Sequence, residues 1–326
     1  MGFWIDTPNI TYWDAIKSIW CQTTPPFILT KKNVLRPTYS IPYIIFKPAN
    51  FKNAVSYSHF IKTNFVSNIN IPSEIISKGF AENKWLGIEA RDIDLNLIGL
   101  IISKPISQFY SSEFPRNPLT GVGLVDYFCI LPAWRKKGLG TRMLFKLHEL
   151  TQSVGRISHI FASEGYFLFS KIPQIIQDKY IWRERYPNIC RLTIEVQKNI
   201  SFTEDFLTQI QKGIGGKNFF AVNFGSPTEI SHYFLEGYHI LVKPTYEQKD
   251  GLQPVGEIIT FWSDSGDKEK EYLFDVLLDC IKEFDIFIAP SEFPRSRLWK
   301  EGAPFGFFPF HFHPGAFDTK RLLLLI

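Results

Sequence analysis

Apolar residues recur along this chain at two characteristic spacings. Over 141–153 they fall three or four positions apart, and Met143, Leu144, Leu147 and Leu150 form one stripe, which predicts an amphipathic helix. The segment at 268–284 is the longest of the helices that the sequence predicts. The remaining predicted helices are 55–65, 73–80 and 202–211.

Shorter apolar runs predict strands. Two of them, 86–90 and 95–102, flank a polar Asp-Ile-Asp segment, which indicates a β-hairpin. Residues 1–40 are rich in proline and aromatic side chains and predict an extended arm. The other predicted strands are 121–131, 158–162, 193–196, 219–223, 257–262 and 285–289.

The order of these elements predicts an α/β (α+β) fold in two lobes. The chain has 326 residues, enough for about two ordinary domains. Beyond Tyr186-Pro187-Asn188 the strand–helix–strand order begins again. We therefore expect two pseudo-repeated lobes, each a mixed sheet flanked by helices, with residues 1–190 in the first and 191–326 in the second.

Composition and charge narrow the class of protein. Hydrophobic residues make up 45% of the chain, enough for a sizeable core, and a net charge of +4 does not indicate nucleic-acid binding. The four cysteines have neither metal-ligand spacing nor a paired framework, so we expect reduced thiols, no metal and a cytoplasmic protein. The longest apolar runs fall far short of the ~20 residues that span a bilayer, which predicts no stable membrane insertion.

The most specific local motif is a basic, glycine-containing turn between a predicted strand and a predicted helix. The start of a helix exposes unpaired N–H groups and a partial positive charge, and glycines let a pyrophosphate approach the backbone closely. Basic side chains would add positive charge for further phosphate contacts. The alternative is an ordinary basic turn. The motif matches the RxxGxG/A pattern of acyl-CoA-dependent N-acyltransferases and consists of Arg135, Lys136, Lys137, Gly138, Leu139 and Gly140, with Thr141 next.

Six segments, in the same order along the chain, resemble the N-myristoyltransferase family. FWIDTP at 3–8 is similar to that family's FW-x-TQP, and WLGIEAR with LIGLI is similar to its WH-x-GVR…LVGFI hairpin. VDYFCI followed by RKK is similar to INFLCVH…RSK. Each match is short, but together they span nearly the whole chain. The remaining matches are FASEG at 161–165, YIWR at 180–183 and KEFDIFIA at 282–289.

The resemblance implies two lobes of the GNAT superfamily type and an acyl-CoA co-substrate, with myristoyl-CoA as the expected form. The phosphates of coenzyme A would meet the basic turn, Phe3 and Trp4 would cover the co-substrate, and Ile130 would line its site. The thioester carbonyl would lie against the backbone N–H groups of Tyr127 and Phe128. Such fixed donors stabilise the negative charge that develops on the carbonyl oxygen, so they would form an oxyanion hole.

The resemblance also implies the reaction, which is transfer of a fatty acyl group to the N-terminal glycine of a peptide or protein. In the family a terminal carboxylate takes a proton from the amine, and here Ile326 follows four leucines. A carboxylate in apolar surroundings is a stronger base than one in water. Asp126, Ser163 and Gly165 would contact the acceptor. The alternative for Ile326 is the end of a strand that only closes a sheet.

Three departures from the family leave two other classes open. The RxxGxG form of the turn belongs to the wider acetyltransferase superfamily, which favours a general GNAT N-acetyltransferase that uses acetyl-CoA. Glu164 stands where the family has a small residue, and the acidic residue of the family's peptide-site loop has no counterpart in 304–308. These two changes favour a non-catalytic descendant that keeps the fold and binds a partner.

Overall fold

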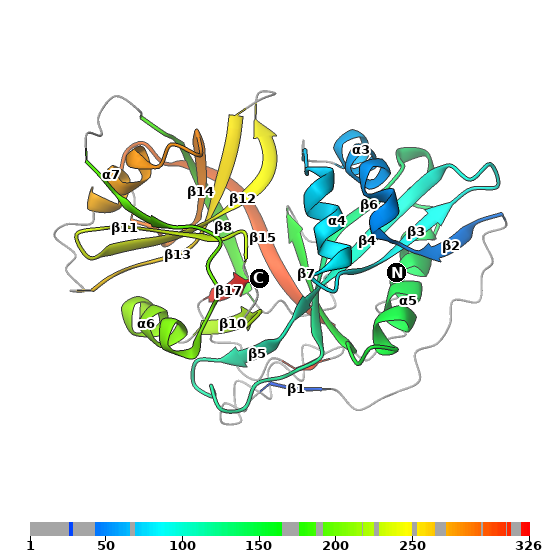
Figure 1. The fold of residues 1–326 in the computed structure, drawn as a ribbon, viewed down its shortest axis with the longest axis horizontal. Coiled ribbons are helices and arrows are strands. Elements are labelled where there is room, and N and C mark those ends of the chain that lie inside the picture. Colours follow the sequence, from blue (N-terminus) through cyan, green and yellow to red (C-terminus); the bar gives the residue numbers. More distant parts are fainter. Residues whose placement is uncertain are drawn as a thin grey trace.

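One large sheet runs through both lobes of the molecule (Figure 1). It has 12 strands in the order β2-β3-β4-β6-β7-β15-β8-β14-β13-β12-β11-β9, and a three-stranded sheet and a two-stranded sheet accompany it. The computed structural model describes residues 26–28, 43–65, 69–164, 176–186, 192–216, 218–224, 228–249, 253–264, 272–294, 296–310, 312–313 and 321–326.

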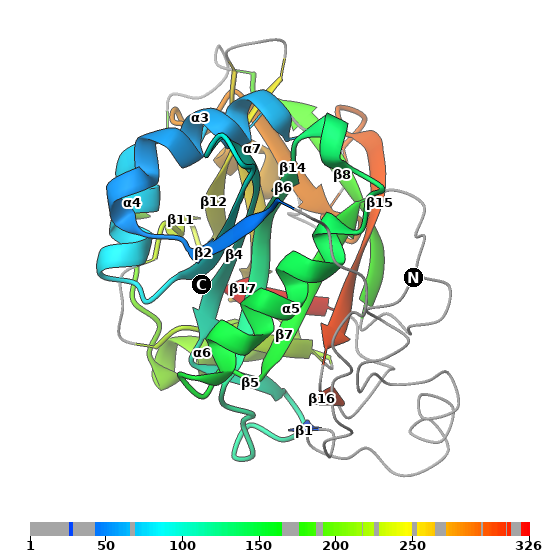
Figure 2. The ribbon, with the colours of Figure 1, turned by 90° about the vertical axis from the view of Figure 1, so that its right-hand side faces the viewer.

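In the N-terminal lobe, helices cover both faces of the sheet. The elements are β1 (Phe27–Ile28), β2 (Ile45–Pro48), α3 (Ala54–Asn64), α4 (Ser73–Ala81), β3 (Leu86–Arg91), β4 (Leu97–Ile106), β5 (Gln108–Ser111), β6 (Val122–Ile130), α5 (Leu139–Gln152) and β7 (Ser158–Glu164). Side chains alternate between the faces of a strand, so Leu100 and Ile102 pack in the cluster with α3 and α4, whereas Ile101 packs with α5. Figure 2 shows α5 lying across its face of this sheet.

The second half repeats the plan of the first. β4 and β6 are antiparallel, and α5 leads to β7, which runs parallel to β6; in the same way β12 and β13 are antiparallel, and α7 leads to β14, parallel to β13. This repeat confirms the predicted fold class. The elements are β8 (Ile176–Glu184), β9 (Glu195–Gln197), α6 (Glu204–Ile214), β10 (Asn218–Val222), β11 (Ser231–Leu235), β12 (Tyr238–Lys249), β13 (Gln253–Ser263), α7 (Tyr272–Cys280), β14 (Ile286–Pro290), β15 (Lys300–Phe310), β16 (Phe312–His313) and β17 (Arg321–Leu325).

Strand pairing ties the two halves together. β15 pairs with β7 on one side and with β8 on the other, which makes the large sheet continuous. The three-stranded sheet has the order β17-β10-β5, so it also joins a strand of the first half to strands of the second. β8 precedes residue 190 but pairs with β14. The division of the chain at residue 190 stays a prediction.

Local predictions were accurate for helices with one buried face. The predictions of 55–65 and 73–80 are confirmed by α3 and α4, and α5 begins two residues before the predicted 141. The predicted end of the last helix is wrong, because α7 ends at Cys280, four residues before 284. Ile281 and Phe284 are buried core residues beyond the helix, so their apolar pattern marked burial rather than helical structure. The predicted arm lies, apart from 26–28, outside the described residues.

Two further sequence expectations concern cysteines and membranes. Cys129 is free and buried, and burial raises the pKa of its thiol to about 11. Cys280 is disulfide-bonded, so the prediction of reduced thiols is wrong there. None of the helices that the structure describes combines the length and the apolar character needed to cross a bilayer.

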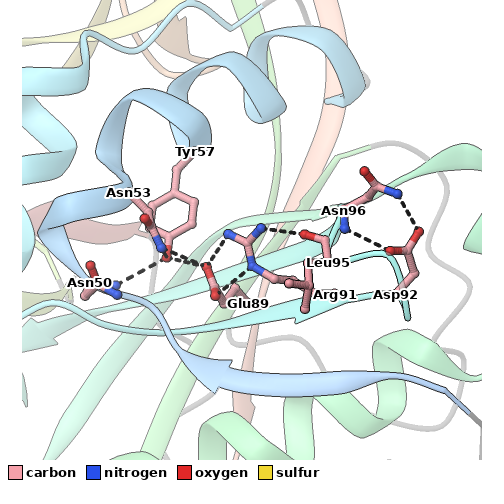
Figure 3. A network of polar contacts seen from close by, with 8 residues as sticks. All are labelled: Asn50, Asn53, Tyr57, Glu89, Arg91, Asp92, Leu95 and Asn96. Carbon is pink, nitrogen blue, oxygen red and sulfur yellow. Dashed lines mark hydrogen bonds and ion pairs between the residues drawn. The ribbon is translucent and has the colours of Figure 1, made fainter.

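A buried carboxylate holds β3 against the helix above it (Figure 3). Tyr57 of α3 donates its hydroxyl hydrogen to Oε2 of Glu89 over 2.7 Å, and Arg91 donates from Nε to Oε1 over 2.9 Å. Asn53 adds a third donor at 3.3 Å. Burial alone would raise the pKa of Glu89, but the hydrogen bonds from Arg91 and Tyr57 lower it below its usual value. The network therefore keeps Glu89 ionised inside the N-terminal lobe.

Candidate active site

A polar cavity of about 670 Å³ receives residues from both halves of the chain. Most of its lining side chains can donate or accept hydrogen bonds, and the charged ones include lysines from both halves. The last residue of the sequence also reaches this cavity. The residues concerned are Lys78, Asn83, Lys104, Asn199, Asn223, Thr228, Glu229, Lys243, Tyr246 and Ile326.

Lys104 and Lys243 occupy equivalent positions in the two pseudo-repeated halves. Lys104 lies on β4 and Lys243 on the corresponding strand β12. Each is followed by a proline, Pro105 or Pro244, and each proline lies opposite a glycine of the next strand. Both lysines and both prolines line the cavity. The pseudo-repeat therefore brings two lysines to one site.

Lys104 is held by an ion pair and by two aromatic rings. Its Nζ lies 2.9 Å from Oδ2 of Asp126, and it donates to the Tyr127 hydroxyl over 3.2 Å. The same nitrogen lies 4.7 Å from the ring centre of Trp85 and 4.6 Å from that of Tyr127. Burial lowers the pKa of Lys104, but Asp126, Tyr127 and Glu229 together raise it above its usual value; burial in turn raises the pKa of Asp126, and Lys104 holds it below its usual value. Both groups are therefore charged at neutral pH.

The strand β6 has a bulge directly after Asp126. Tyr127 and Phe128 together lie opposite a single residue of β4, Ile101. Tyr127 has a φ of 49°, and its backbone N–H donates to Oδ1 of Asp126 over 2.8 Å. The Tyr127 side chain packs on the α3–α4 side, whereas that of Phe128 packs towards α5. The bulge thus takes the two residues predicted to form the oxyanion hole out of the regular pairing with β4. Asp126 accepts a hydrogen bond from the N–H group of one of them, Tyr127.

Beyond this bulge β6 separates from β7. The parallel pairing of the two strands ends at Val125 and Phe161, although β6 continues to Ile130 and β7 to Glu164. Within the described ranges, no strand pairs with 126–130 on that side. Unpaired strand edges present N–H and C=O groups that a ligand can contact. The opened edge leads directly to the basic turn before α5.

The predicted glycine turn leads directly into the start of α5. Gly138 has a φ of 80°, in the left-handed region that favours glycine, and α5 starts at Leu139 with no side-chain cap. A Cβ on Gly140 would lie 3.2 Å from the Ile130 side chain, so this first turn packs close to β6. Leu139 is buried, whereas Thr141 is half-buried. The turn can therefore offer mainly backbone N–H groups to an anion.

The basic side chains of this turn have structural contacts of their own. Arg135 donates to the carbonyl oxygens of Ile130 and Asn64, over 2.9 Å and 2.8 Å. The Nζ of Lys137 lies 5.4 Å from the ring centre of Trp134. Lys136 is exposed and has a φ of 60°. Arg135 therefore ties the turn to the end of β6 and to α3 in addition to supplying charge.

The C-terminal strand is built into the interior. β17 runs parallel to β10, and the N–H of Asn223 donates to the Leu325 carbonyl over 3.1 Å. Leu323 and Leu325 are fully buried in the cluster below α6, and the alternate residues, ending with Ile326, pack on a second cluster. Figure 1 shows this end of the chain near the centre of the molecule. β17 therefore delivers Ile326 to the cavity wall.

The structure brings some of the predicted site residues together. Ile326 lines the same cavity as Lys104, the ion-pair partner of Asp126. Phe3, Trp4 and Gly165 lie outside the described residues, as does the side chain of Ser163. In the part of the chain that the structure describes, no group of three or more His, Cys, Asp or Glu side chains could hold a metal ion.

Most residues of the cavity were not singled out from the sequence, and four of them have evident roles in it. Tyr246 donates its hydroxyl hydrogen to Oε1 of Glu229 over 2.6 Å. Lys104 and Lys243 each stand at the end of an apolar strand run, directly before a proline. A lysine-proline pair in the same place in both halves is the signal that could have found them.

Two GNAT-type lobes joined by shared strands define the class of fold to which this chain belongs. Among solved structures it is similar to Saccharomyces cerevisiae N-myristoyltransferase with bound myristoyl-CoA, with a TM-score of 0.63, 10% identity and coverage of 95% of this chain and 92% of that one. It is also similar to a tandem GNAT protein from the clavulanic acid biosynthesis pathway, with a TM-score of 0.50, 8% identity and coverage of 82% and 98%. No family model and no curated protein matches the sequence. The chain therefore has an N-myristoyltransferase-like GNAT fold.

Proposed function

We propose that this protein is an acyl-CoA-dependent N-acyltransferase that transfers a fatty acyl group, expected to be myristoyl, to the N-terminal glycine of a peptide or protein. One observation carries the proposal: β17 brings Ile326 to the wall of a polar cavity. Lys104 lines the same cavity, and its ion-pair partner Asp126 lies directly before the bulge of β6. A buried strand that ends at a polar cavity presents a carboxylate where an amine can be deprotonated, provided that Ile326 is the last residue.

The first part of the proposal concerns the acyl donor. Acyl-CoA, when bound, supplies the acyl group as a thioester. The N–H groups at the start of α5 and the charges of Lys136 and Lys137 bind its phosphates. The edge of 126–130 that lacks a partner strand among the described residues holds the extended part of the co-substrate. Phe3 and Trp4 are proposed to cover it, and Ile130 to line its site.

The second part concerns the chemical step. The carboxylate of Ile326 takes one proton from the acceptor ammonium, and the resulting amine attacks the thioester carbonyl. As the C–N bond forms the C–S bond breaks, and coenzyme A leaves as the thiol after its sulfur takes up the second proton that the nitrogen gives up. An α-amino group has a pKa near ~8, so its deprotonation near neutral pH costs little free energy. The backbone N–H groups of Tyr127 and Phe128 donate to the developing oxyanion, and for the first of them this requires release from Asp126. Asp126, Ser163 and Gly165 are proposed to contact the acceptor.

The experiment is intact-mass analysis of glycine-initiated peptides incubated with the full chain and either myristoyl-CoA or acetyl-CoA. The proposal predicts a mass gain of one myristoyl group on the peptide. Peptides with a blocked N-terminus serve as the control and should remain unchanged. Absence of any acyl transfer, despite measurable acyl-CoA binding, would contradict the proposal and would favour a non-catalytic protein.

A second candidate function is general N-acetyl transfer from acetyl-CoA. The turn that contains Gly138 and Gly140 favours it, because this RxxGxG form is typical of acetyltransferases. The same mass experiment separates the two functions. Acetyl transfer without myristoyl transfer would assign the protein to the second one.

A further inference from the structure

The cavity contains a lysine, Lys243, that no described residue neutralises by direct contact. Lys243 is half-buried on the cavity wall, and among the described residues it has neither a hydrogen bond nor an ion pair. Lys104, its equivalent in the first half, is by contrast paired with Asp126. A half-buried ammonium group without a direct partner is costly, and an anion beside it would lower that cost.

The surroundings of Lys243 favour an incoming anion. Burial and the neighbouring positive charge of Lys104 lower the pKa of Lys243, and Glu257, Asp126 and Glu229 offset this only in part. Among the described residues that line the cavity, Glu229 is the single acidic side chain, and it accepts the hydroxyl hydrogen of Tyr246. The described part of the wall carries three lysines against that one acidic side chain and the proposed carboxylate of Ile326.

A neutral donor lies in the same cavity. Oδ1 of Asn223 accepts a hydrogen bond from the Ser107 hydroxyl over 2.5 Å, so the Nδ2 end of the amide is left to donate. The backbone N–H of Asn223 also donates to the Leu325 carbonyl, so this residue lies beside the end of β17. The two oxygens of a carboxylate can accept hydrogen bonds from an ammonium group and from an amide N–H at the same time.

We propose that Lys243 and Asn223 form a carboxylate-binding subsite, so that preferred acceptors carry a carboxylate close to the amine that is acylated. The inference rests on the proposed N-acyltransferase function and names its acceptor class. The ammonium of such an acceptor lies at Ile326 and its carboxylate at Lys243, and both charges are then neutralised within one cavity. The carboxylate is either the α-carboxylate of a small amino acid or an acidic side chain near the N-terminus of a peptide.

The test compares matched acceptors that differ only in one carboxylate. One pair is a Gly-Glu peptide and the corresponding Gly-Gln peptide, both amidated at the C-terminus, and the other pair is glycine and glycinamide. In one of the pairs, we expect kcat/KM to be at least about tenfold higher for the acceptor with the carboxylate than for its amide counterpart. This is the size of effect that one hydrogen bond between charged partners produces. The pair that shows the preference identifies the source of the carboxylate.

Variants of Lys243 then assign the preference to this side chain. Lys243→Met should reduce the preference to about twofold or less while leaving the amide acceptor nearly unchanged, whereas Lys243→Arg should retain most of it. Lys282→Met, at an exposed position after α7, should leave both acceptors unaffected. The retained activity of Lys243→Arg and of the amide acceptor separates loss of the subsite from failure to fold.

Two outcomes would overturn the inference, and a third would overturn the proposed function instead. Transfer to carboxylate and amide acceptors at equal kcat/KM contradicts the subsite, as does a preference that survives in Lys243→Met. If no acceptor is acylated, calorimetric titration with the same four compounds shows whether the carboxylate subsite exists without acyl transfer. Carboxylate-selective binding that is lost in Lys243→Met supports the subsite without the acyltransferase function, and unselective or absent binding refutes the subsite too.

Discussion

Lys104 and Asp126 form an ion pair, with 2.9 Å between Nζ and Oδ2, directly before the bulge of β6. Asp126 also accepts the N–H of Tyr127, so one carboxylate links the cavity lysine to the bulge backbone. The ion pair therefore links the charge of the cavity lysine to the position of the Tyr127 N–H group, which is proposed to bind the thioester oxygen.

Removal of the lysine alone should be strongly destabilising. Lys104→Met leaves the Asp126 carboxylate without its cation, and we expect the free energy of unfolding at neutral pH to fall by about 3 kcal/mol. The double variant Lys104→Met/Asp126→Asn removes both charges and should recover most of that loss. Chemical denaturation of the wild type, the double variant and both single variants, Lys104→Met and Asp126→Asn, measures the coupling energy. Equal losses in the single and double variants would show that the pair contributes nothing.

The turn before α5 offers a matched pair of glycine substitutions. Gly138 has a φ of 80° and Gly155, after α5, has a φ of 79°. Alanine at either position is strained and should lower the free energy of unfolding by about 1 kcal/mol. Only Gly138→Ala should also weaken acyl-CoA binding several-fold, because it displaces the N–H groups at the start of the helix. Equal acyl-CoA affinity of the two variants, measured by titration, would argue against phosphate binding at this turn.

A buried histidine should make stability depend on pH. Nε2 of His232 lies 3.0 Å from Nδ1 of His239, and its ring stacks on Trp262. Burial, with a smaller contribution from His239, lowers the pKa of His232 to about 4. An unfolded histidine has a pKa near ~6.5, so only the unfolded chain takes up this proton between those values. The contribution to stability is complete above the upper value and is lost as the pH falls through the window.

The expected loss from this histidine is about 2 kcal/mol between about pH 7.5 and about pH 5. His232→Phe keeps an aromatic ring at this position but cannot titrate, so its free energy of unfolding should fall less over the same range. Denaturant unfolding at a series of pH values gives both slopes. Parallel slopes for the wild type and the variant would contradict the assignment of this proton to His232.

Local pattern predicted the helices with one buried face, because burial of one face imposes the 3.6-residue spacing on the sequence. It also indicated the turn at Gly138, since a left-handed residue before a helix favours glycine. It failed at Ile281 and Phe284, which are buried without being helical. Pairing between distant strands, such as β10 with β17, leaves no local pattern, so the position of Ile326 could be inferred only from a resemblance.

The cavity itself was beyond sequence analysis for a related reason. Lys104 and Lys243 each stand in an apolar strand and resemble ordinary strand residues when read one at a time. Only the association of the two halves brings them to one cavity. Asp126 was expected at the site, but its ion pair with Lys104 and its hydrogen bond to Tyr127 depend on the register and the bulge of β6, which hydrophobic spacing does not encode.

The most direct test of the central claim is the rate of acyl transfer by a variant that lacks Ile326, measured together with its acyl-CoA affinity. We expect the rate to fall by at least about 100-fold, the usual contribution of a general base, while acyl-CoA binding stays within about twofold of the wild type. A variant extended by one glycine beyond Ile326 should lose transfer in the same way. Transfer at the wild-type rate by the truncated protein would contradict the account, because the terminal carboxylate would then not be the base.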